Sequence, residues 1–124
     1  MEYMNRQVNM QPMPKVTYQA LVGKTLASER ERRKILQTTV AAELGVTQSA
    51  YSKLESGASA LNASQIHLAT RALGMTAADL MTRVAKNEER LKAEGVDVVH
   101  TKEDNSAAVI IGLGLLAAML FGKA

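Results

Sequence analysis

Polar side chains gather in a short stretch near the middle of the chain: Thr47, Gln48, Ser49, Ser52 and Lys53. Their amide, hydroxyl and ammonium groups suit the edges of nucleic-acid bases, because glutamine can bridge N6 and N7 of adenine and serine can donate or accept a hydrogen bond. The same residues are also an ordinary composition for the solvated face of a helix. Composition alone leaves both interpretations open.

Two short helices joined by a tight turn are predicted to position these side chains. The stretch QTTVAAELG, which begins at Gln37, carries an apolar stripe and ends at Gly45, which can adopt the left-handed conformation that stops a helix. Thr47 can then cap a second helix over residues 48–56. The predicted inner face of this second helix consists of Ala50, Tyr51 and Leu54.

Three further helices are predicted from apolar periodicity and capping pairs. The first has apolar residues at three- and four-residue spacing, namely Tyr18, Leu21, Val22 and Leu26. The other two begin at capping pairs, formed by Asn62 with Gln65 and by Thr76 with Asp79. The sequence therefore predicts an all-α, five-helix domain over residues 17–83, without strands.

The segments on either side of this domain are predicted to be of three kinds. Residues 1–16 contain two prolines and are expected to form a mobile N-terminal arm. Residues 84–106 are expected to be a charged helical spacer and linker, although VDVVH also alternates weakly, as a short strand would. Residues 107–122 carry no charge and are expected to form a hydrophobic helix.

The hydrophobic segment 107–122 has three possible roles: a membrane anchor, a soluble oligomerisation helix, or a disordered or processed tail. Sixteen helical residues reach about 24 Å, against a hydrocarbon core of about 30 Å. Small residues four apart would allow close helix packing, namely Gly114, Ala118 and Gly122. The charges that flank the segment give no orientation. If the segment inserts and the domain binds DNA, the domain would lie at the cytoplasmic face of the inner membrane; otherwise a cytoplasmic protein is expected.

The overall composition narrows the range of functions. The 124-residue chain has a formal net charge of +3 and the whole excess lies in residues 1–81, which permits a nucleic-acid partner. Three Tyr, one Phe and no Trp argue against an aromatic platform for single strands, and the lack of Cys excludes thiolate sites. His67 and His100 have no metal-ligand spacing, so no metal, no cofactor and no enzymatic activity are expected.

From Gln37 to Leu54 the chain resembles the Cro/CI-type (XRE) helix-turn-helix family of phage and bacterial regulators, and the resemblance extends over about residues 19–81. The matching positions are Gln37, Ala41, Gly45, Gln48, Tyr51, Leu54 and the LESG sequence that closes the second helix. Two positions depart from the family pattern. Leu36 stands where Ser or Thr usually caps the first helix of the pair, and Lys34 replaces a common glycine.

The resemblance implies a sequence-specific transcriptional regulator, such as a repressor, that binds double-stranded DNA as a homodimer or higher homo-oligomer. The base-reading residues would be Thr47, Gln48, Ser49, Ser52 and Lys53. The DNA backbone would be contacted by Gln37, Lys24, Arg33, Lys34 and Ser59, with main-chain N–H groups of the turn after Gly57 also approaching phosphates. Arg30 and Glu55 would form a structural ion pair. The alternative is a membrane-tethered structural or interaction protein that uses the helix-turn-helix domain for protein contacts.

Overall fold

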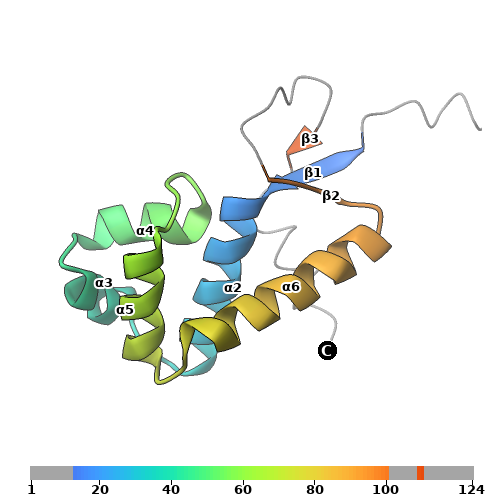
Figure 1. Cartoon of the computed structure of the whole chain (residues 1–124). Coiled ribbons are helices and arrows are strands. Elements are labelled where there is room, and N and C mark those ends of the chain that lie inside the picture. Colours follow the sequence, from blue (N-terminus) through green and yellow to red (C-terminus); the bar gives the residue numbers. More distant parts are fainter. Residues whose placement is uncertain (1–12, 101–108, 111–124) are drawn as a thin grey trace, which may run out of the picture.

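The computed structural model describes residues 13–100 and 109–110, and it contains five helices and three short strands within these ranges (Figure 1). The helices are α2 (Tyr18–Arg32), α3 (Gln37–Leu44), α4 (Gln48–Ser56), α5 (Ala63–Leu73) and α6 (Ala77–Ala93). The strands are β1 (Pro14–Thr17), β2 (Asp97–Val99) and β3 (Val109–Ile110). The prediction of five helices is confirmed, whereas the prediction of a purely α-helical fold is wrong.

Helix α2 is the central element of the helical domain. It packs against α4 on one side and α6 on the other, and α3 packs against both α4 and α5. Figure 1 shows α2 lying between the α3–α4 pair and α6. The largest fully buried apolar side chains come from α2, α4 and α6 and from the first strand, namely Leu21, Leu26, Tyr51, Leu80, Leu91 and Val16. Burying each such side chain stabilises the fold by roughly 1.5–3 kcal/mol.

The strands form a parallel sheet in the order β2-β1-β3. Strand β1 precedes the five helices and β2 follows them, so their pairing joins the two ends of the helical domain. Val16 and Val98 are paired in register and both are buried. Parallel strands need a long crossover connection, which the helices supply here.

This sheet corrects two predictions about the flanking segments. Residues 14–16 are not a mobile arm, because Val16 is only 1% exposed and the segment pairs with two other strands. Residues 97–99 are a strand and not a linker, because Val98 points into the core while its neighbours are half-buried. Helix α6 also continues to Ala93 with Leu91 fully buried, so the first part of the predicted spacer belongs to the folded domain.

The prediction of a hydrophobic helix over residues 107–122 is wrong at Val109–Ile110, which are extended and pair with the main chain of β1. β-branched residues favour such extended conformations when a strand edge is available. The remainder of that segment lies outside the described residues, as do residues 1–12 and the small residues Gly114, Ala118 and Gly122. Across residues 13–100 and 109–110, no helix combines the length and the apolar character needed to cross a membrane.

Candidate nucleic-acid interface

The turn between α3 and α4 fixes where α4 begins. Gly45 ends α3 in the left-handed conformation, with φ of 72°. Thr47 is extended, and its Oγ1 accepts a hydrogen bond of 3.0 Å from the main-chain N–H of Ala50. Because this bond satisfies one of the free amides of the first turn, α4 starts at Gln48, as the sequence predicts.

Helix α4 exposes one polar face and buries the other. All five residues predicted to read bases are exposed, namely Thr47, Gln48, Ser49, Ser52 and Lys53. The buried side consists of Tyr51, Leu54 and Glu55. Ala50 corrects the prediction, because it is exposed and belongs to the polar face. Relative to the predicted inner face, the buried side of the helix is rotated away from Ala50 and towards Glu55. Ala50 can be exposed while Tyr51 is buried because successive residues lie about 100° apart around a helix.

A buried ion pair holds α4 against α2 and explains this rotation. Arg30 donates from Nε to Oε2 of Glu55 at 2.7 Å and from Nη2 to Oε1 at 3.1 Å, while its Nη1 donates to the carbonyl of Ile35 at 2.8 Å. Both charged side chains are nearly inaccessible. Burial opposes the charge of Arg30, but the hydrogen bond and the charge of Glu55 raise the pKa of the guanidinium. The pair lies where the family resemblance implies it.

Tyr51 packs beside this pair and is fully buried. Burial raises the pKa of the Tyr51 phenol, and interaction with Glu55 adds to this effect. Among the described residues, no partner satisfies the hydrogen-bond geometry of the Tyr51 hydroxyl. The ring, which fills the core between the helices, is therefore the part of this residue that contributes most to anchoring α4.

Gln37 connects the ion pair to the exposed face. Its Nε2 donates to Oε1 of Glu55 at 2.8 Å, and its Oε1 accepts a longer bond of 3.4 Å from Nε2 of Gln48. One amide N–H of Gln37 is thus used within the protein, and the other remains available for the predicted phosphate contact. The chain of contacts from Arg30 to Gln48 orients the first glutamine of α4 before any ligand binds.

The structure brings together three of the residues predicted to contact DNA at a shallow depression between α2 and α4. This depression has a volume of about 130 Å³, and its lining includes Lys24, Gln37 and Ser52, together with the ion pair of Arg30 and Glu55 and the side chain of Glu31. Lys24 belongs to α2, is half-buried, and contributes a cationic side chain to the lining of this depression. A phosphate beside Ser52 would therefore find an amide and a cation at the same place.

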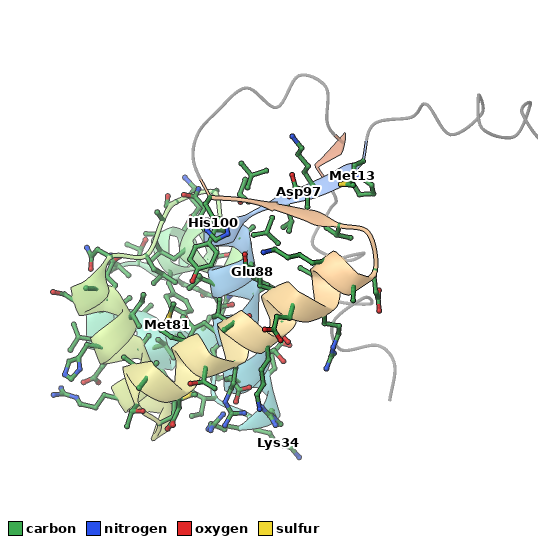
Figure 2. All side chains as sticks on the ribbon, turned by 45° about the vertical axis from the view of Figure 1, so that its right-hand side comes forward. Met13, Lys34, Met81, Glu88, Asp97 and His100 are labelled. Atoms are coloured by element: carbon green, nitrogen blue, oxygen red, sulfur yellow. The ribbon has the colours of Figure 1, made fainter. Side chains whose placement is uncertain are left out.

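Two other predicted backbone contacts lie apart from this depression. Arg33 donates to Oε1 of Glu29 at 2.6 Å, and Arg32 and Arg83 pair with the same carboxylate. Arg83 belongs to α6, so Arg33 is held on the α6 side of α2. Although burial disfavours the ionised carboxylate, the arginines hold the pKa of Glu29 below its ordinary value. Lys34 is exposed beyond the end of α2, far from the sheet (Figure 2).

The turn after α4 differs from the expectation that its main-chain N–H groups approach phosphates. The amides of Gly57, Ala58 and Ser59 donate to Leu54 O, Ser56 Oγ and Lys53 O respectively. The amides of Ala58 and Ser59 are therefore used within the protein, and the exposed hydroxyl of Ser59 is available for such a contact. The prediction for the main-chain groups is wrong at Ala58 and Ser59.

Gly23, which the sequence analysis did not single out, decides how closely α4 approaches α2. A β-carbon at this position would lie 2.6 Å from the carbonyl oxygen of Glu55 and would also collide with that of Leu54. These are main-chain atoms, which cannot move aside without displacing α4. The sequence offered one signal for this close approach, which is a glycine inside an apolar helical pattern. Glycine destabilises a helix interior relative to alanine, so its presence there indicates close packing.

Comparisons with known proteins agree with this geometry. Residues 26–80 match the helix-turn-helix family model, whereas no curated protein matches the chain significantly. The crystal structure of the clp gene regulator ClgR from C. glutamicum is similar, with a TM-score of 0.53 and 23% sequence identity over 56% of this chain and 90% of that chain. At this identity the likeness shows the fold alone. Residues 26–80 therefore form a helix-turn-helix domain, which agrees with the resemblance to the Cro/CI (XRE) type.

Proposed function

We propose that this protein is a sequence-specific transcriptional regulator that binds double-stranded DNA and is not an enzyme. The observation that carries the proposal is the first half of α4, where Gln48, Ser49 and Ser52 are exposed together with Ala50, while Tyr51, Leu54 and Glu55 are buried on the opposite side. A rigid helix with exposed hydrogen-bonding groups at its N-terminal end suits the major groove. The likeness to a solved gene regulator supports the same proposal.

Within this proposal the roles of the residues follow from their positions. Gln48 and Ser49 read base edges from the first turn, and the methyl group of Ala50 is available to a thymine methyl. Lys24 and the free amide N–H of Gln37 hold a phosphate at the depression beside Ser52. The protein binds as a homodimer, because a single short helix covers only one half-site.

The test is duplex binding by the full-length chain, measured by fluorescence anisotropy after selection of a preferred sequence from a random pool. Gln48→Ala should relax the preference at one base pair by about 1–3 kcal/mol without changing the other positions. Lys53→Ala should weaken binding to all sequences and reduce the salt slope by about one phosphate contact.

Lys86→Ala is the matched control, because Lys86 is exposed on α6, on the other side of α2 from α4. This variant should keep the wild-type affinity and salt slope. If the wild type shows no preference for any duplex over competitor DNA, the proposal is refuted. The alternative use of the domain for protein contacts would then take its place.

A further inference from the structure

A cavity of about 530 Å³ lies between the start of α2, the turn after α4, and the end of β2. Its wall includes Tyr18, Val22, Leu61, Ile66, Met81 and His100. Figure 2 shows His100 above α6, with Glu88 next to it and Met81 farther along the same helix. None of the residues that line this cavity lines the depression between α2 and α4, so the two sites are separate.

One wall of the cavity is a fixed pair of rings. Tyr18 and His100 are stacked, with centroids 4.6 Å apart and an angle of 23° between their planes. His100 Nε2 lies 2.6 Å from Oε2 of Glu88, and this hydrogen bond holds the imidazole in place. The imidazole is 51% exposed. A flat, polarisable surface of this kind favours the stacking of a planar ring.

The rest of the lining carries no formal charge. Apart from His100, whose imidazole is paired with Glu88, the lining side chains are apolar, amide, hydroxyl or phenol groups. Burial, and then the charge of Glu88, raise the pKa of Tyr18, so this phenol stays neutral. A charged ligand would lose its hydration without gaining a counter-ion from the lining, because Glu88 does not line the cavity and is already paired with Lys92 and His100.

We propose that this cavity binds a neutral, largely apolar small molecule that carries a planar ring. Its volume lies within the range of about 300–1,000 Å³ that is typical of small-molecule sites, and its lining is mainly apolar with a few polar groups, as in such sites. A bound molecule would also contact residues that are linked to the C-terminal end of α4. Gln19, which lines the cavity, donates from Nε2 to the carbonyl of Gly57 at 2.6 Å, and Leu61 lies in the turn after α4.

The test uses two fluorescent probes that share one ring system. N-phenyl-1-naphthylamine is neutral, and 1-anilinonaphthalene-8-sulfonate adds a single negative charge. Titration of the full-length protein should show saturable binding of the neutral probe with one site per chain, and at least about tenfold weaker binding of the anionic probe.

Two variants locate the bound probe in the cavity. Ile66→Trp fills the cavity, and His100→Ala removes the flat wall at an exposed residue whose loss should not unfold the domain. Each should weaken binding of the neutral probe at least about tenfold, with circular dichroism confirming that the variants remain folded. Leu36→Ala is the control, because Leu36 is an apolar residue that is 68% exposed and lies outside the cavity; it should bind as the wild type does.

Three results would overturn the proposal. Equal binding of the two probes would mean that the site does not select neutral molecules. Unchanged binding in both Ile66→Trp and His100→Ala would place the probe on another surface. Binding that appears only after the chain is shortened to end at residue 110 would mean that the apolar residues beyond it, or a second copy of the chain, already fill the cavity.

Discussion

Replacing Lys34 by glycine is expected to stabilise the protein. Lys34 follows the end of α2 with φ of 59°, and it is the one non-glycine residue with positive φ in the part of the chain that the structure describes. Two hydrogen bonds fix this conformation, from Lys34 N to Glu31 O at 3.0 Å and from Ile35 N to Arg30 O at 3.1 Å. They form a Schellman motif, in which the left-handed position normally belongs to glycine.

The expected gain follows from two opposing terms. A residue with a β-carbon in the left-handed conformation costs about 1–2 kcal/mol, which glycine avoids. Glycine also gives the unfolded chain more freedom, which costs about 0.4–1 kcal/mol on folding. The free energy of unfolding of Lys34→Gly should therefore rise by about 0.5–1 kcal/mol. For a domain of this size, such a change raises the thermal midpoint by about 2–8 °C.

Lys34→Ala is the matched control for this measurement. It removes the same charge and the same long side chain but keeps the β-carbon, so its stability in urea and thermal unfolding should stay close to that of the wild type. If Lys34→Gly is no more stable than Lys34→Ala, the reasoning from backbone conformation is refuted. Both variants should lose duplex affinity equally if Lys34 contacts a phosphate, which separates the effect on binding from the effect on stability.

Three other substitutions test the packing around α4 and α2. Glu55→Gln should lower the free energy of unfolding, measured by urea titration, by about 3 kcal/mol, because it leaves the buried charge of Arg30 uncompensated. A free energy equal to that of the wild type within experimental error would contradict a buried ion pair. Gly23→Ala should lower the free energy of unfolding by about 1–3 kcal/mol, because the added β-carbon collides with the carbonyl oxygen of Leu54. Alanine is the better helix former, so a higher thermal midpoint in this variant would disprove the clash. Because the folded pKa of Glu29 lies below its ordinary value of 4.5, the stability that this group contributes is present above pH 4.5 and is lost as the pH falls through the folded pKa. Glu29→Gln should flatten this part of the curve of urea midpoint against pH, and an unchanged slope would rule out the contribution of this carboxylate.

The sequence by itself determined the five helices and most of their ends, although not the end of α6 at Ala93. Gly45 and Thr47 mark the turn between α3 and α4, and the capping pair of Asn62 and Gln65 opens α5, as the sequence predicts. These signals act within one helical turn of the residue that carries them, so they can be interpreted without tertiary contacts. The polar face of α4 could be identified for the same reason, because its members recur at helical spacing.

The tertiary structure alone decided the sheet, because its short strands have partners far away in the chain. Pro14–Thr17 can form β1 only once five helices have brought Asp97–Val99 beside it. Local preference is too weak to hold a strand of three or four residues without such a partner.

The exact rotation of α4 was likewise set by long-range contacts. Ala50 is exposed and not on the expected inner face, whereas Glu55 is buried because Arg30, on another helix, pairs with its carboxylate. Arg33 lies on the α6 side of α2, away from the predicted interface, because it pairs with Glu29, which also pairs with Arg83 of α6. Helical periodicity shows which residues lie on the same face of a helix. The contacts with the other helices determine which residues at the border of that face are buried.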